Sequence, residues 1–178
     1  NPSGANFRSL PPSTDPKRYF PRLSEVVQGN LTQVNPATGE AWETVSEIER
    51  NLRFACTVRD NAAGGGQVVS DVLDVRVIKA AGPFIVTSQT SEETYVAGSV
   101  QEITWDVSNT DIAPINAQQV DIFLSLDGGL TYPITLLENT LNDGAEEVLL
   151  PGNVTNTGRI MVKASNNIFF AVNSTDFT

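Results

Sequence analysis

QVDIFLSLDGGLTYPITLL, residues 119–137, is the most informative part of this sequence. Val120, Ile122 and Leu124 occupy every second position, which is the pattern of a strand with one buried face. The Asp-Gly-Gly that follows is typical of a tight turn, and a second apolar run begins after it. The stretch therefore predicts a β-hairpin.

The turn of this hairpin fits the Asp-box pattern S-x-D-x-G-x-T-aromatic, with tyrosine where tryptophan is usual. The matching positions are Ser125, Asp127, Gly129, Thr131 and Tyr132. We expect the aspartate to accept hydrogen bonds from turn N–H groups and the glycine to supply a positive φ. We expect the aromatic ring to cap the turn. These residues are predicted to form a structural turn and not a chemical site.

The sequence around the hairpin is rich in short strand patterns separated by turn residues. The candidate strands in the C-terminal half are residues 84–89, 101–107, 119–125, 130–137, 145–150, 158–164 and 168–173. Seven short strands at this spacing are typical of an immunoglobulin- or fibronectin-like sandwich. We therefore predict an all-β chain with such a sandwich over residues 83–178.

We predict that residues 1–80 form a second immunoglobulin-like β-module that lacks some of its strands. Residues 52–60 and 68–78 alternate as strands, and Cys56 falls on the apolar face of the first. Two clear strands are too few to close a sandwich, so we expect the missing ones to precede Asn1. Ala-Ala-Gly-Pro at 80–83 interrupts the pattern and predicts the boundary between the modules.

The composition excludes several classes of function. The chain has no histidine, which excludes Ser-His-Asp sites and zinc motifs of the HExxH type. Its single cysteine excludes an internal disulfide and a multi-cysteine metal cluster. A formal charge of −10 argues against nucleic acid as a partner, and no apolar run is long enough for membrane insertion. We expect Cys56 to be an inert core thiol.

Several segments together resemble a known sequence type. They are NLRFACTVRDNAAGGGQ, GPFIVTSQ, EITWDVSNTDIAPINAQQVDIFLSLDGGLTYP, NDGAEEVLLPGNV, RIMVKASNNIFFAVNSTDFT and, near the start, FRSLPPS and RYFPRLSEVVQGN. The sequence resembles the region downstream of the catalytic domain in secreted reprolysin-like zinc metallopeptidases of Bacteroidetes-type bacteria. The resemblance covers nearly the whole chain, and related modules also occur in other large secreted and surface proteins.

The resemblance implies a non-catalytic accessory region, secreted or held at the cell surface. The zinc ligands and the general base of such enzymes have no matching positions here, so no catalytic residue is carried over. The implied partners are the catalytic domain of the parent chain and an extracellular protein or polysaccharide. An adhesin-type module that binds carbohydrate or protein remains the alternative.

Three aspartates of the first module are candidate calcium ligands. Asp60, Asp71 and Asp74 flank its hairpin, and calcium takes six to eight oxygen ligands. Their spacing matches neither an EF-hand nor a cadherin-type site. The alternative is that they are solvated carboxylates on a strand face.

Three aromatic residues are candidates for a surface that binds sugar rings. They are Tyr19, Trp42 and Tyr95. Trp105, by contrast, alternates with Ile103 and is expected in the core.

Overall fold

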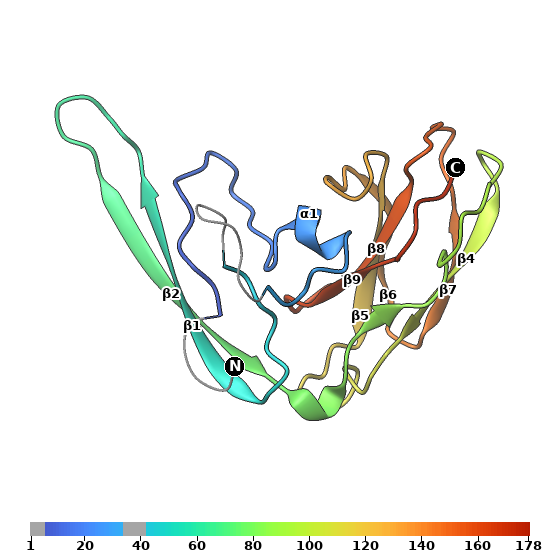
Figure 1. The fold of residues 1–178 in the computed structure, drawn as a ribbon, viewed down its shortest axis with the longest axis horizontal. Helices are drawn as coiled ribbons and strands as arrows, with labels where there is room; N and C mark the ends of the chain where they lie inside the picture. Colours follow the sequence, from blue (N-terminus) through green and yellow to red (C-terminus); the bar gives the residue numbers. More distant parts are fainter. Residues whose placement is uncertain (1–5, 34–41) are drawn as a thin grey trace. The chain divides into compact units, whose positions relative to one another are not determined.

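The computed structural model describes residues 6–33 and 42–178, which contain nine strands, one short α-helix and one 3-10 turn. The elements in chain order are α1 (Leu23–Val26), β1 (Arg50–Arg59), β2 (Val68–Val77), η1 (Lys79–Ala81), β3 (Ile85–Val86), β4 (Val100–Asp106), β5 (Gln119–Ser125), β6 (Ile134–Leu141), β7 (Ala145–Leu149), β8 (Arg159–Ala164) and β9 (Phe170–Val172). All three sheets are antiparallel, so the predicted all-β class is confirmed (Figure 1). None of the helices within the described ranges has the length and apolar character needed to cross a membrane.

The chain divides into two compact units, and the border between them falls at residues 80 and 81. This border lies within the junction predicted at 80–83. The units nevertheless differ from the predicted domains, because the described part of residues 6–45 packs with residues 81–178. A first domain over residues 1–80 is therefore not what the structure shows. The first unit, in its described part, is residues 46–80.

The first unit is a hairpin of β1 and β2 with ten paired positions. Paired residues share one face, so the hairpin has a polar face and an apolar face. On the polar face Arg53 holds Asp74 through two hydrogen bonds of 2.7 and 2.8 Å. On the apolar face Val58 lies opposite Val69. The described residues of this unit form one two-stranded sheet and not a sandwich.

The prediction that Cys56 is a buried core thiol is wrong. The residue lies on the apolar face of β1, as its alternation indicated, but its side chain is exposed. Its neighbours Val58 and Val69 are exposed as well, at 64% and 67%. The physical reason is that alternation assigns a residue to a face, whereas burial requires a second layer, and the described part of this unit supplies none.

The second unit contains a two-layer β-sandwich. One sheet has the strand order β3-β4-β7 and the other has the order β6-β5-β8-β9. β5 is central because it pairs with both β6 and β8. Val120, Ile122 and Leu124 are buried, as the alternation predicted, and Ser125 at the end of the strand is buried as well. Figure 1 shows the two sheets facing one another.

The core fills the space between these two sheets. Its buried members are Val86, Ile103, Trp105, Val120, Ile122, Leu124, Val148, Leu150, Ile160, Val162 and Phe177. Trp105 is buried, and its indole N–H donates to the Asn142 side-chain oxygen at 2.8 Å. The amide of Asn142 in turn donates to Thr110 and to the Ala117 carbonyl, both at 2.9 Å. This buried tryptophan therefore has its polar atom satisfied, which low-dielectric burial requires.

Residues 6–33 and 42–45 join the sandwich unit mainly as irregular chain. A fully buried carboxylate, Glu43, organises them: it accepts from the backbone N–H of Arg22 at 2.8 Å and from the Arg18 guanidinium at 3.2 Å. The short helix α1 lies in this segment, and no side chain caps it. Tyr19 packs edge-on against Phe170 of β9, with ring centroids 5.2 Å apart.

Candidate functional site

The turn after β5 is held by the aspartate that the sequence singled out. The Asp127 carboxylate accepts hydrogen bonds from the N–H of Leu130 at 3.1 Å and of Thr131 at 2.9 Å. It also accepts from the hydroxyls of Ser125 at 2.6 Å and Thr131 at 2.7 Å. Desolvation alone raises the pKa of this carboxyl, but the four hydrogen bonds outweigh it and leave the pKa below its usual range. The carboxylate is thus committed to its own turn, as predicted.

Gly129 and Tyr132 are the other two residues of the Asp-box pattern. Gly129 has a φ of +84°, and a Cβ added there would lie 2.4 Å from Val27 Cγ1 and 3.0 Å from the Tyr132 hydroxyl. Glycine is therefore required by the backbone conformation and by the close approach of two side chains. Burial raises the pKa of the Tyr132 phenol. Its hydroxyl lies beside Gly129 of the turn, and the capping role that the Asp-box pattern gives to its ring stays a prediction.

This turn fastens a second segment, residues 151–157, to the end of the sandwich. The carbonyl of Leu126 accepts from the Thr155 hydroxyl at 2.8 Å and from the Thr157 hydroxyl at 3.1 Å. The N–H of Gly128 donates to the Thr157 carbonyl at 2.9 Å. The rigid turn thereby fixes the position of a loop that has no strand of its own.

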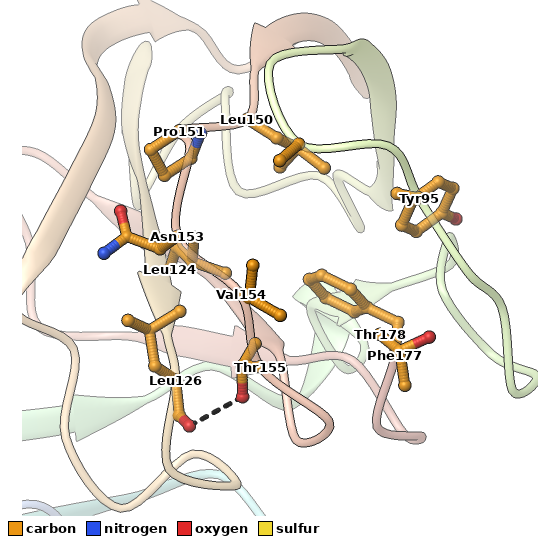
Figure 2. A pocket seen from close by; sticks show the side chains of 11 residues that line it. Tyr95, Leu124, Leu126, Leu150, Pro151, Asn153, Val154, Thr155, Phe177 and Thr178 are labelled. Carbon is orange, nitrogen blue, oxygen red and sulfur yellow. Dashed lines mark hydrogen bonds between the residues drawn. The ribbon is translucent and has the colours of Figure 1, made fainter.

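A pocket of about 120 Å³ lies between this loop and the end of the chain (Figure 2). Its lining is mostly apolar and comes from four separate stretches of sequence: Tyr95, Ala97, Leu124, Leu126, Leu150, Pro151, Asn153, Val154, Thr155, Phe177 and Thr178. Val154 stands at its mouth with 90% of its surface exposed. Leu124 and Leu150 belong to the core, so the pocket opens directly onto the interior packing of the sandwich.

Phe177 forms one wall of the pocket and is fixed from both sides. Its backbone pairs with Gly158 through hydrogen bonds of 2.9 and 3.1 Å, and a Cβ at Gly158 would meet the Phe177 ring at 2.6 Å. The Tyr95 ring packs edge-on against the other side, with centroids 5.4 Å apart. Tyr95 is held in turn by a backbone hydrogen bond of 2.7 Å to the Thr178 carbonyl.

The hydroxyl of Tyr95 joins this wall to a carboxylate, Glu93. The Tyr95 hydroxyl donates to Glu93 Oε2, and the Ser91 hydroxyl donates to Glu93 Oε1 at 3.0 Å. These two hydrogen bonds, with that from Tyr95 the stronger, lower the pKa of Glu93, so the carboxylate stays ionised. Burial, followed by the bond to Glu93, raises the pKa of the Tyr95 phenol. Tyr95 carries the only titratable side chain among the residues that line the pocket.

The candidate calcium ligands are not brought together. Asp60 accepts from the N–H groups of Ala62 and Gln67 at its own turn, at 3.1 and 2.9 Å. Asp71 and Asp74 lie three residues apart on β2 and so on opposite faces, and Asp74 is paired with an arginine. Across the described ranges 6–33 and 42–178, no three acidic or cysteine residues are grouped as metal ligands.

The three candidate aromatic residues pack against three different partners. Tyr19 contacts Phe170, and the Arg8 guanidinium lies over the Trp42 ring with 5.7 Å to the centroid. Tyr95 alone lines the pocket. Of the three aromatic residues predicted to form a binding surface, only Tyr95 therefore lies at the pocket.

The sequence patterns did not point to the other pocket residues. Leu126, Val154 and Phe177 have no motif in common and lie far apart along the chain. The sequence contains only an indirect signal for this pocket, because the Asp-box turn implies a rigid strand end to which a loop can bind.

The comparisons with known proteins leave the family of this chain open. No protein-family model matches the sequence. A search of curated proteins finds no match either. Function must therefore be argued from the site and from the sequence resemblance.

Proposed function

We propose that this chain is a non-catalytic accessory region of a secreted bacterial zinc metallopeptidase, and that its sandwich engages the substrate or another extracellular partner. The observation that carries the proposal is the apolar pocket beside Tyr95, with Val154 exposed at its mouth (Figure 2). A concave apolar surface with few polar groups is the usual form of a binding site. Apolar side chains that stand exposed at such a site favour contact with another molecule.

The non-catalytic part of the proposal is supported by where the polar groups are used. The chain has no histidine to act as base or zinc ligand. Asp127 and Glu43 bind turn and backbone N–H groups of their own unit. Asp121 does the same, because it accepts from the Asn139 N–H at 2.9 Å and from the Ser165 hydroxyl at 2.7 Å. Carboxylates held in this way stabilise the fold and leave little freedom for proton transfer.

The assignment of the parent is supported by the sequence resemblance, in particular by the run from ITWDV to LSLDGGLTYP. In that reading the immunoglobulin- or fibronectin-like sandwich spaces or orients the catalytic domain of the parent. It also adds a contact for the protein substrate, which raises the effective concentration of substrate at the catalytic domain.

An adhesin-type module that binds carbohydrate or protein is the second candidate. The aromatic wall formed by Tyr95 and Phe177 favours it, since tyrosine is a common contact residue for both kinds of ligand. The two candidates differ in the parent: a peptidase carries an HExxH segment upstream, whereas an adhesin carries repeated sandwich modules.

The test is to read the parent sequence and then to delete residues 1–178 from the parent enzyme. We expect an HExxH segment upstream. We also expect slower cleavage of a folded protein substrate and an unchanged rate on a short peptide, because only the large substrate reaches the accessory region. Repeated sandwich modules without HExxH would replace this proposal with the adhesin.

A further inference from the structure

The acidic charge of the molecule is concentrated in the part that carries the pocket. Residues 81–178 contain twelve acidic and two basic residues, whereas residues 1–80 contain nine of each. Of the two basic residues, Arg159 is paired with Asp176. Residues 81–178 therefore carry a net negative charge, and a negative charge favours a cationic partner in both encounter and orientation.

One of these negative charges is fixed at the pocket wall. Both oxygens of Glu93 are held, one by the Ser91 hydroxyl and one by the hydroxyl of Tyr95, whose ring lines the pocket. The carboxylate is solvent-exposed, so it remains available to a cation from outside. A single tyrosine side chain thus joins an apolar hollow to an ordered anion.

The volume and lining of the pocket define what fits inside it. About 120 Å³ is close to the volume of cavities that hold one benzene-sized group. The hydroxyl of Thr155 is already bonded to the Leu126 carbonyl. A sugar ring would bring several hydroxyl groups against this mostly apolar lining and leave most of them without partners, which is costly. An aliphatic side chain meets no such cost.

The geometry points to an extended segment of a protein partner as the ligand, with an aliphatic side chain in the pocket and a lysine or arginine two residues away paired with Glu93. In an extended chain, side chains two residues apart share a face and lie about 7 Å apart. That spacing suits this site, in which the Tyr95 side chain separates the pocket from the Glu93 carboxylate. The inference rests on the proposed function and specifies the partner of the same site.

The test is a titration of the full chain, labelled with nitrogen-15, by a capped peptide Lys-Gly-Leu-Gly-Lys, followed by amide chemical shifts. We expect weak, saturable shifts at the amides that line the pocket, reduced by added salt because exposed charges are screened. Lys-Gly-Gly-Gly-Lys lacks the anchor and Glu-Gly-Leu-Gly-Glu reverses the charge. Both are expected to bind clearly more weakly.

Two variants with matched controls separate the two contacts. Val154→Ser removes exposed apolar surface and is expected to weaken the affinity for Lys-Gly-Leu-Gly-Lys about fivefold. Glu93→Gln is expected to weaken this affinity about threefold and to leave the affinity for the uncharged Gly-Gly-Leu-Gly-Gly unchanged. The controls are Leu149→Ser, at another exposed apolar position, and Glu147→Gln, at another exposed acid.

The possible failures can be told apart. If neutral oligosaccharides shift the pocket amides and the peptides do not, the peptide ligand is wrong while the proposed binding role stands. If neither peptides nor oligosaccharides shift these amides, both the inference and the binding role are overturned. Equal effects of Glu93→Gln and Glu147→Gln would overturn the pairing with Glu93.

Discussion

At the scale of single residues, the molecule uses its polar groups to shape turns, and those turns set the position of the apolar ones. Asp127 collects the N–H and hydroxyl groups of one turn, and the carbonyl of Leu126 beside it receives two threonine hydroxyls. Of this first set of bonds, the pattern S-x-D-x-G-x-T predicted those from the N–H groups and not those from the Ser125 and Thr131 hydroxyls. The second set was not predictable, because Thr155 and Thr157 lie about thirty residues downstream with no local signal.

The Asp127 turn gives a prediction for stability. Asp127→Ala removes four hydrogen bonds and is expected to lower the free energy of unfolding by about 1–3 kcal/mol, measured by urea denaturation at neutral pH. Asp143→Ala is the matched control, because Asp143 is an exposed aspartate in another glycine turn. Equal losses in the two variants would contradict the role given to Asp127.

The same residue predicts a dependence on pH. The folded pKa of Asp127 is lower than that of the unfolded chain, so its contribution is complete above the unfolded pKa, about 4. It is lost as the pH falls through the folded pKa. Between neutral pH and about pH 3, the wild-type chain should therefore lose more stability than Asp127→Ala. Parallel curves of unfolding free energy against pH would contradict this.

Gly158 gives a third prediction at this scale. A Cβ at Gly158 meets the Phe177 ring at 2.6 to 2.9 Å, so Gly158→Ala must displace a wall of the pocket. We expect a loss of about 1–3 kcal/mol in unfolding free energy, the usual cost of overpacking. Gly152→Ala has open space around its Cβ and should change stability by less than about 0.5 kcal/mol. A neutral Gly158→Ala would contradict the packing described.

At the scale of elements, most of the sandwich followed from alternation, and the errors have identifiable causes. β5 spans the seven residues predicted for it, whereas β6 begins at Ile134 and not at residue 130. Residues 130–133 belong to the turn instead. The N–H groups of Leu130 and Thr131 donate to Asp127, and Tyr132 and Pro133 follow them. The hairpin of β1 and β2 was also predicted, but alternation did not reveal that Cys56 would be exposed.

At the scale of the whole molecule, the division into units could not be read from the sequence. A clear junction at 80–83 suggested that everything before it formed one domain, yet residues 6–33 and 42–45 pack with the sandwich. Proline-rich, irregular chain has no periodicity that reports its packing partner. The contacts that decide the matter are between single residues, such as Tyr19 with Phe170 and Val27 with Gly129.

This division predicts the outcome of truncation. A chain of residues 81–178 loses both of those contacts and is expected to melt at least about 5 °C below the full chain in a thermal denaturation scan. Replacement of residues 46–80 by a flexible Gly/Ser linker removes the other unit. It should leave the main transition of the sandwich nearly unchanged. Equal melting temperatures for residues 81–178 and the full chain would contradict the observed division.

We propose that this chain contributes binding, and not chemistry, through the pocket bounded by Tyr95, Val154 and Phe177. The most direct measurement is the rate of cleavage by the parent enzyme of a folded protein and of a short peptide, with Val154→Ser compared with Leu149→Ser. Val154→Ser is expected to slow cleavage of the protein about fivefold and to leave the peptide rate unchanged, whereas Leu149→Ser is expected to change neither rate. Equal slowing on both substrates, or an unchanged rate on the protein, would contradict it.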